Sequence, residues 1–366
     1  MNKPRRKTKR INVGGIPIGG DAPISVQSMT TTNTDDVKAT ATQIHQLENA
    51  GCEIVRVAVP DHPSARVLSK IREQIKIPLI ADIHFDYQLG LIALEEGVDC
   101  VRLNPGNIGS REKLEKVAAS AKAKKIPIRI GINAGSLEKD LLEKYGYPKA
   151  EAMVESAFRA LHILEEMEFY DTKVSLKASH VALAVEAYRL FSAKSDYPLH
   201  LGVTEAGTLF TGSIKSSIGL GLLLSEGIGD TIRVSLAADP VEEVRAGFEI
   251  LKALELRHRG INVIACPTCG RLEIDVIKLA NDVEKKLGHI RTPLNISILG
   301  CVVNGIGEGM EADVGIAGGR DSAILFKKGE IVRKVNADEI YDVLIEEAIE
   351  VAKEKEAQEV RHPARN

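Results

Sequence analysis

The segment IVRVAVP, residues 54–60, is one of eight short runs rich in β-branched residues between residues 25 and 237. The segments between the runs have an apolar spacing near 3.6 residues, as in DDVKATATQIHQLENAG (35–51), which begins on Asp and ends on Gly as helices often do. Strands that alternate with helices pair in parallel. The expected strands are SVQSMT (25–30), IVRVAVP (54–60), PLIADIH (78–84), VRLNPG (101–106), IPIRIGIN (126–133), TKVSLKAS (172–179), LHLGVTEAG (199–207) and TIRVSLA (231–237).

Eight strand–helix units within about 230 residues predict a (β/α)8 barrel, the TIM barrel. A doubly wound sheet is the alternative, but it would usually show fewer repeats and a Gly-rich phosphate loop after the first strand. The sequence has no such loop. The Gly-rich segment VGGIPIGGDAP (13–23) precedes the first strand, and we expect it to form a hairpin that closes the lower end of the barrel.

The pattern changes after about residue 258, where a smaller α/β domain is expected to begin. We therefore predict a TIM-barrel domain at residues 1–257 and a second, smaller domain at residues 258–366. The elements expected in the second domain are strands in INVIACP (261–267) and PLNISILG (293–300), a helix in RLEIDVIKLANDVEKKLG (271–288), then the segment DVGIAGG (313–319), a hairpin in SAILFKKGEIVRKV (322–335) and a last helix from Asp338 to about Lys353.

Composition and charge restrict the class of protein. The net charge of −3 argues against a duplex or an anionic membrane as partner, and the apolar stretches are too short to cross a bilayer. Five cysteines, an odd number, indicate a reducing cytoplasm, where nearby cysteines are more often metal ligands or catalytic than disulfide-bonded. The basic segment KPRRKTKR (3–10) has no interleaved aromatic residue for base stacking, so we expect a solvated tail.

Positive charges lie within or at the end of five expected strands. In a barrel of this kind the site is built at the carboxyl ends of the strands. A charge inside a strand is costly unless a partner neutralises it, and two or three carboxylates do not cancel five cations. The pattern predicts a substrate with several negative charges, most simply a diphosphate. The cations are Arg56, Arg102, Arg129, Lys177 and Arg233.

Polar residues are expected at the same rim. Among them we single out Glu205, in VTEAG, for acid–base work or charge stabilisation, because a carboxylate near a phosphate ligand would otherwise repel it. Its alternative role is that of an internal counter-ion for Lys177 or Arg233. The other polar residues are Asp82, His84, Asn104, Asn133, Ser179, Thr204 and Ser235.

Three cysteines follow two expected strands of the second domain. Cys266 and Cys269 form the motif CPTC after INVIA, and Cys301 follows NISILG. Parallel neighbouring strands would bring all three sulfur atoms to one end of the small sheet. A dithiol switch needs no third thiol, and a structural zinc site needs a fourth Cys or His ligand. Neither His258 nor His289 is placed to supply that ligand.

Glu308 lies seven residues after Cys301, beyond a Gly-rich turn expected in CVVNGIGEG (301–309) that would let the backbone fold back on a metal. Three thiolates and one oxygen ligand suit a 4Fe–4S cluster better than zinc, because a weak fourth ligand leaves one iron open to substrate. Cys52 and Cys100 each precede a barrel strand, and we expect them to be small core residues.

Together these motifs resemble a known family. CPTCGR, GCVVNGIGE, RVAVP, DIHFDY, VRLNPGN, RIGIN, SLKAS and TEAG, between about residues 8 and 350, are similar to the bacterial 4-hydroxy-3-methylbut-2-en-1-yl diphosphate synthases of the non-mevalonate isoprenoid pathway. One departure is Ile306, where the family usually has Pro, in the turn expected to carry Glu308.

The resemblance implies an oxidoreductase that opens the ring of 2-C-methyl-D-erythritol 2,4-cyclodiphosphate and removes water. Two electrons would arrive singly from flavodoxin or ferredoxin through a 4Fe–4S cluster. It also implies a homodimer in which the small domain of one chain caps the barrel of the other. The implied cluster ligands are Cys266, Cys269, Cys301 and Glu308. The residues implied at the substrate are Arg56, Asp82, His84, Arg102, Arg129, Asn133, Lys177, Thr204, Arg233 and Ser235, with Glu205 in acid–base work.

The sequence leaves two alternative functions open. The first is a Schiff-base barrel lyase that uses Lys177, on the sixth strand, with the cysteines as a structural zinc site. The second is an RNA-binding module that combines the basic tail with a zinc knuckle, which predicts a steep dependence of binding on salt.

Overall fold

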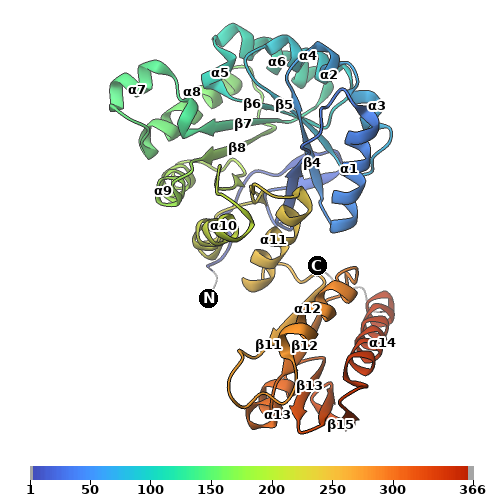
Figure 1. Ribbon diagram of the computed structural model, residues 1–366. Coiled ribbons are helices and arrows are strands. Elements are labelled where there is room, and N and C mark those ends of the chain that lie inside the picture. Colours follow the sequence, from blue (N-terminus) through green and yellow to red (C-terminus); the bar gives the residue numbers. More distant parts are fainter. Residues whose placement is uncertain (1–2, 362–366) are drawn as a thin grey trace. The chain divides into compact units, whose positions relative to one another are not determined.

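The computed structural model describes residues 3–361, apart from the side chains of residues 304–306, 308 and 359–361. The chain divides after Arg257 into two compact units. The first contains an eight-stranded parallel barrel and the second a five-stranded mixed sheet, as the sequence predicts for a (β/α)8 barrel followed by an α/β domain (Figure 1).

The barrel strands are hydrogen-bonded in the order β8-β7-β6-β5-β4-β3-β10-β9. An isolated parallel bridge between Val174 on β8 and Leu199, the residue before β9, brings the barrel close to closure. The strands are β3 (Ser25–Met29), β4 (Ile54–Val59), β5 (Leu79–Ile83), β6 (Cys100–Leu103), β7 (Ile128–Asn133), β8 (Thr172–Lys177), β9 (His200–Leu201) and β10 (Thr231–Ile232).

Helices connect successive barrel strands and bury their apolar faces against the sheet. The helix that the segment 35–51 predicts begins after Asp36, whose carboxylate accepts a hydrogen bond from the Ala39 amide, and ends at Gly51 in a left-handed conformation. The main helices are α1 (Val37–Ala50), α3 (Leu68–Arg72), α4 (Tyr87–Glu95), α6 (Arg111–Lys124), α8 (Ala150–Glu166), α9 (Val181–Ser192), α10 (Leu209–Ser225) and α11 (Pro240–Ala253). Shorter pieces are α2 (His62–Ala65), α5 (Pro105–Ile108), η1 (Ala134–Ser136) and α7 (Lys139–Tyr145).

Strands β9 and β10 are much shorter than the expected runs 199–207 and 231–237. Backbone hydrogen bonds continue past their ends, from the Arg233 amide to the Leu201 carbonyl and from the Thr204 amide to the Ala178 carbonyl. The chain then leaves the sheet to form loops. The residues after each short strand therefore belong to the rim of the barrel.

The expected hairpin before the first barrel strand is confirmed. Strands β1 (Ile11–Val13) and β2 (Ile16–Ile18) pair in antiparallel orientation. Their apolar residues pack against Ile54, Ile80 and Cys100, which lie at or near the beginning of β4, β5 and β6. The hairpin thus closes the barrel at the end opposite the carboxyl ends of the strands. Cys52 and Cys100 are buried in the apolar core, as predicted.

The prediction of a solvated basic tail is wrong. Arg5 forms an ion pair with Asp230 at 3.2 Å, and Arg6 donates to the carbonyl of Tyr197 at 2.7 Å. The amides of Lys3, Arg6 and Lys9 also donate to backbone carbonyls of the loops before β9 and β10 or of the end of α10. The tail is held because the barrel offers it a buried carboxylate and free carbonyl groups, which the spacing of basic residues does not reveal.

The second unit is a sheet with the order β11-β12-β13-β14-β15, in which the first three strands are parallel and the last two form a hairpin. Apolar residues of α12 and α14 pack on one face of the sheet. Leu299, Ala317 and Phe326 form a smaller cluster. The elements are β11 (Ile261–Ala265), α12 (Val276–Leu287), β12 (Leu294–Leu299), α13 (Val302–Met310), β13 (Val314–Gly319), β14 (Ser322–Lys327), β15 (Glu330–Asn336) and α14 (Ile340–Arg361).

Three helices of this unit differ from the prediction. Helix α12 begins at Val276 and not at residue 271, because Asp275 caps it by accepting from the Lys278 amide. Helix α14 continues to Arg361, past the expected end at Lys353. Residues 302–310 form helix α13, so the expected Gly-rich turn after Cys301 is wrong. None of the helices in the described range has the length and apolar character that crossing a membrane requires.

Candidate functional site

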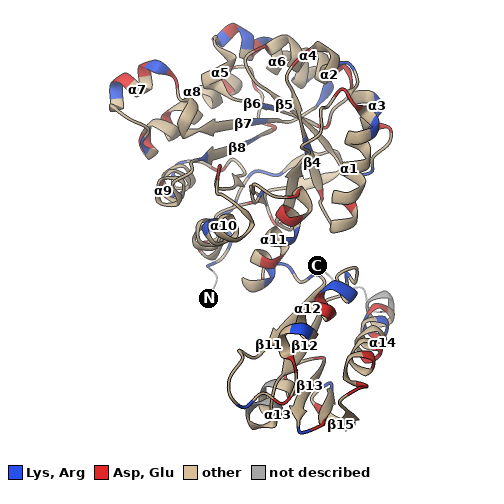
Figure 2. Ribbon diagram, viewed as in Figure 1, with Lys and Arg blue, Asp and Glu red and all other residues tan. Residues whose placement is uncertain are grey.

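A polar cavity of about 120 Å³ opens at the carboxyl ends of the barrel strands. This is the end of a TIM barrel at which active sites are found. Cationic residues lie on the barrel strands themselves and not only on the outer helices (Figure 2). The cavity is lined by Arg56, Asp82, His84, Arg102, Arg129, Asn133, Ser175, Lys177, Thr204, Arg233 and Ser235.

The structure brings together all ten residues that were expected at the substrate and adds Ser175. Ser175 lies on β8, two residues before Lys177, and therefore faces the same side of the strand. The alternation along TKVSLKAS could have identified it. Asn104 and Ser179 do not line the cavity, although they follow barrel strands. Asn104 instead caps α5 and donates to Ser136 Oγ at 2.7 Å.

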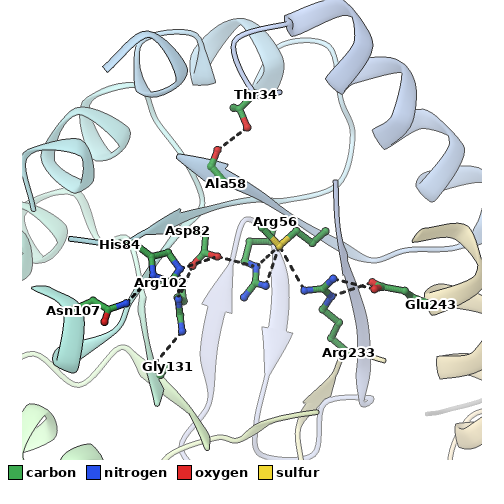
Figure 3. Close-up of polar contacts among 11 residues, drawn as sticks. Thr34, Arg56, Ala58, Asp82, His84, Arg102, Asn107, Gly131, Arg233 and Glu243 are labelled. Carbon is green, nitrogen blue, oxygen red and sulfur yellow. Dashed lines mark hydrogen bonds and ion pairs between the residues drawn. The ribbon is translucent and has the colours of Figure 1, made fainter. Parts of the chain in front are cut away.

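Asp82 is the acidic residue in the lining of the cavity, and two arginines share it (Figure 3). Its carboxylate lies 3.0 Å from Arg102 Nη1 and 3.6 Å from Arg56 Nε. Burial alone would raise the pKa of Asp82, but the attraction of Arg56 and Arg102 outweighs burial and places this pKa well below its usual range. Asp82 is therefore a carboxylate at neutral pH and offsets part of the positive charge.

Arg233 has its own counter-ion, Glu243 on α11, which the sequence did not suggest. The two side chains form a bidentate pair, with both N–O distances at 3.0 Å (Figure 3). Glu243 is 3% exposed and also accepts from Ser28 Oγ at 2.8 Å and from the Leu236 amide at 3.1 Å. The predicted alternative role of Glu205, as counter-ion of Arg233, is thus filled by Glu243.

The sulfur atom of Met29 lies between Arg56 and Arg233. Arg56 Nε and Nη2 approach Met29 Sδ at 3.2 and 3.0 Å, and Arg233 Nη1 approaches it at 3.5 Å. A thioether is a weak hydrogen-bond acceptor. These guanidinium groups therefore keep donors that a stronger acceptor, such as a phosphate oxygen, can engage.

Two further cations lack a carboxylate partner among the described residues. Arg129 is 1% exposed, and its Nε and Nη1 atoms have no hydrogen-bond partner in the described part of the chain. Burial and the nearby Arg102 lower the pKa of Arg129 to about 10, which leaves the guanidinium charged at neutral pH. Burial and the neighbouring arginines place the pKa of Lys177 well below its ordinary value. The cavity thus holds positive charge that Asp82 and Glu243 do not cancel.

Two glycines make room for these cations on inward-facing positions of the barrel. A Cβ atom at Gly131 would lie 2.4 Å from Arg102 Nε. A Cβ atom at Gly202 would lie 2.7 Å from Lys177 Nζ and 2.7 Å from the Arg233 carbonyl oxygen. Any other residue at either position would displace a charged side chain that lines the cavity.

His84 and Glu205 lie at the mouth of the barrel in different settings. His84 Nε2 lies 2.8 Å from Arg102 Nη1, and because a guanidinium only donates, this imidazole nitrogen accepts. The other ring nitrogen lies 2.9 Å from the side-chain amide of Asn107. Glu205 is exposed, follows Thr204 in a left-handed backbone conformation with φ of 53°, and is not among the residues that line the cavity.

The three cysteines of the second unit are free thiols that follow two neighbouring parallel strands. Cys266 follows β11, and Cys301 comes two residues after the end of β12. Cys266 Sγ accepts a hydrogen bond from the Gly300 amide at 3.1 Å. A Cβ atom at Gly300 would lie 2.1 Å from Leu272 Cδ2, so a larger residue there would displace the Leu272 side chain. Cys269 is exposed and Cys301 is half-buried.

This arrangement fits a metal cluster in its chemistry. Free thiols at one sheet edge, with a backbone amide directed at one sulfur atom, are the donors that iron–sulfur clusters use. Within the described residues, however, no three His, Cys, Asp or Glu side chains are close enough together to hold a metal ion. The side chains of Ile306 and Glu308, both in α13, lie outside the described residues.

Models of two protein-family domains match nearly the whole chain. A model described as the GcpE TIM-barrel domain matches residues 8–248, and one described as the GcpE protein C-terminal domain matches residues 262–350. The chain belongs to the GcpE family. The cavity residues lie within the first match, and the three cysteines lie within the second.

Relatives of this GcpE chain are similar over almost their full length. A protein of Geobacter sulfurreducens named 4-hydroxy-3-methylbut-2-en-1-yl diphosphate synthase (flavodoxin) is 59% identical over 96% of this chain and 99% of its own. A protein of the same name from Acidithiobacillus ferrooxidans is 59% identical over 93% of each chain. Among solved structures, a dihydropteroate synthase of Xanthomonas albilineans aligns with a TM-score of 0.48 and 13% identity, over 68% of this chain and 98% of its own.

Proposed function

We propose that this protein catalyses the reductive ring opening and dehydration of 2-C-methyl-D-erythritol 2,4-cyclodiphosphate to (E)-4-hydroxy-3-methylbut-2-en-1-yl diphosphate. The observation that carries the proposal is the excess of positive charge in the barrel cavity, which suits a ligand with two phosphate groups. Full-length relatives at 59% identity bear the name of the synthase, so the Schiff-base lyase is not supported.

The cavity residues would bind and orient the diphosphate. Arg129 and Lys177, which have no carboxylate partner among the described residues, would neutralise phosphate charge directly. Arg56 and Arg233 would exchange the weak contact with Met29 for phosphate oxygens. Asn133, Thr204 and Ser235 would donate hydrogen bonds to the ligand, and Asp82 and His84 would fix the orientation of Arg102.

Two glutamates are the proposed catalytic residues, and Glu205 is the one proposed for acid–base work. Glu205 lies on the loop after β9, next to Thr204 in the cavity wall, so a small movement of this loop would bring its carboxylate to the ligand. Its left-handed backbone at φ of 53° is unfavourable for a residue with a side chain, and such strain is concentrated at functional loops. Glu308 is the second candidate.

Cys266, Cys269, Cys301 and Glu308 are the residues that we propose as ligands of a 4Fe–4S cluster. Such a cluster, when bound, passes electrons singly to the substrate. The Gly300 amide, which donates to Cys266 Sγ, would stabilise a thiolate at that position. The role of the protein is to present the thiols at one sheet edge and to keep their strands in register.

The proposal includes partners. Flavodoxin, or ferredoxin, would supply electrons, in line with the flavodoxin in the names of the relatives. The cysteines and the cavity belong to different units of the chain. We propose a cytoplasmic homodimer in which the small domain of one chain covers the barrel of the other, so that electrons reach the substrate.

Metal analysis and electron paramagnetic resonance of anaerobically purified protein test this function. We expect about four iron and four sulfide ions per chain, and a signal after reduction. Cys301→Ser should abolish the signal, whereas Arg102→Met should keep the signal and weaken binding of the cyclodiphosphate. Cys52→Ala, at a buried core cysteine, is the matched control and should keep both. Zinc without iron in wild-type protein would overturn the proposal.

A further inference from the structure

Lys173 lies inside the barrel, one step below the cavity. It is the second residue of β8, and inward-facing positions alternate along this strand, so Lys173 points to the same side as Ser175 and Lys177. Ser175 and Lys177 line the cavity, whereas Lys173 does not. Its side chain is 0% exposed, and its Nζ atom has no hydrogen-bond partner among the described residues.

The pairing of the strands places Lys173 at the end of a row of charges. Asp82 on β5 is in register with Arg102 on β6, Arg102 with Arg129 on β7, and Arg129 with Lys173 on β8. The carboxylate of Asp82 is already shared by Arg56 and Arg102. Lys173 on β8 is therefore three strands away from Asp82 on β5, and this carboxylate already pairs with two arginines.

The other titratable groups that face Lys173 add no negative charge. Cys100 on β6 is buried, and burial raises the pKa of its thiol, so it stays neutral. Arg129, Lys177 and the buried His200 on β9 are cationic or neutral. Burial, and then the repulsion of Arg129, lower the pKa of Lys173 to about 8. The ammonium group is thus still mostly protonated at neutral pH.

A buried charge without a partner destabilises a folded protein, and an apolar side chain of similar length would not. Among the described residues, no hydrogen bond to Lys173 Nζ offsets this cost. An anionic ligand in the cavity would offset it. Two residues along a strand correspond to about 6.6 Å, a distance over which the interaction of charges inside a protein remains strong.

We propose that Lys173 is an affinity-determining residue of the site, which strengthens the binding of a diphosphate through its charge and without touching the ligand. The inference rests on the proposed function, since it requires a polyanion in the cavity. It adds a sixth cation to the five that sequence reasoning identified. Lys173 lies two residues before Ser175 on β8 and provides a positive charge just below the residues that line the cavity.

The test uses Lys173→Met and Lys173→Gln in the full-length protein, with inorganic pyrophosphate as the probe. Isothermal titration calorimetry at pH 7 should show binding that is weaker by about ten-fold or more in both variants. Thermal unfolding without ligand should occur at the same or a higher temperature than in the wild type, because an unpaired buried charge has been removed. If Lys173 had a purely structural role, its replacement would lower the unfolding temperature and leave the affinity for pyrophosphate unchanged.

Thr172→Val is the matched control. Thr172 is the neighbouring residue on β8, is also 0% exposed, and has a hydroxyl without a partner among the described residues, but it is neutral and on the opposite face of the strand. Its replacement should leave the affinity unchanged. Wild-type affinity in both Lys173 variants, or weaker binding that accompanies a large loss of stability in both, would overturn the inference alone. Failure of the wild type to bind pyrophosphate would overturn the polyanion site and the inference together.

Discussion

At the scale of single residues, the charges of the cavity fall into two groups. Arg56 and Arg102 share the carboxylate of Asp82, Arg233 pairs with Glu243, and these ion pairs fix the geometry of the three arginines. Arg129 and Lys177 have no carboxylate partner among the described residues and are open to a ligand. The arginines in ion pairs stabilise the folded barrel. The two cations without a carboxylate partner attract an anionic ligand.

Replacement of Glu243 by Gln should destabilise the protein. The variant leaves the half-buried Arg233 without its counter-ion, and removing one partner of a largely buried ion pair costs about 3 kcal/mol or more. Urea unfolding measures the change. Glu242→Gln is the control, because Glu242 pairs with the exposed Arg245 and its loss should cost less than about 1 kcal/mol. Equal stability of the two variants would contradict the structural role of Glu243.

Replacement of Gly202 by Ala should weaken ligand binding. The new methyl group would lie 2.7 Å from Lys177 Nζ, so the ammonium group must move away from its place in the cavity. We expect the affinity for pyrophosphate to fall about ten-fold in calorimetry. The control is Gly221→Ala in α10, where a methyl group meets no other atom within 4 Å and helix propensity favours alanine. Unchanged binding in Gly202→Ala would show that Lys177 is not needed in that position.

At the scale of elements, sequence patterns predicted the strands well where alternation and burial agree. IVRVAVP and PLIADIH became β4 and β5 almost as expected, because their Val, Ile and Leu side chains are buried. The patterns failed where tertiary contacts decide. VTEAG looked like the end of a strand, but its residues leave the sheet after β9. The glycines after Cys301 suggested a turn, yet packing against the second sheet favours helix α13.

The N-terminal segment is an element that only the structure defines. Asp230 is its anchor, since this buried carboxylate accepts from Thr8 Oγ1 at 3.0 Å and from the Leu199 amide at 2.8 Å, in addition to its ion pair with Arg5. Asp230→Asn should release the segment. We expect faster trypsin cleavage at Arg5 and Arg6, and a loss of about 1–3 kcal/mol in urea unfolding. Asp196→Asn, which removes only the exposed partner of Lys9, should leave the cleavage rate unchanged.

At the scale of the whole molecule, the sequence predicted both domains and the content of the cavity, because cations within strands are rare enough to be informative. It did not predict Glu243, which lies on a helix with several other acidic residues. The contact of Met29 with two arginines could not be inferred, since the contacts of a side chain inside a barrel depend on which strands are in register. The alternation along TKVSLKAS could have placed Lys173 inside the barrel, but not its lack of a hydrogen-bond partner.

The stability of the whole molecule should depend on pH because of the buried lysine. The pKa of Lys173 falls from 10.5 to about 8 on folding, so the unfolded chain binds the proton more tightly. Between pH 8 and 10.5 the native state loses this proton first, and the free energy of unfolding gains about 3 kcal/mol as the pH rises. Urea unfolding at pH 7.5 and 9.5 should show a smaller rise in Lys173→Met than in the wild type. Equal rises would mean that Lys173 has an ordinary pKa.

The barrel strands pair with their neighbours over different lengths. Strands β4 and β5 pair over five positions, while in the described part of the chain one isolated bridge, between Val174 and Leu199, links β8 to the residue before β9. Local opening of the barrel should begin at this junction between β8 and β9. Its amide protons should therefore exchange with deuterium earlier than those between β4 and β5. Lys177 ends β8 and Thr204 follows β9, so a ligand bound by both residues would link the two strands at this junction. Occupancy of the cavity should then slow exchange on the two sides together.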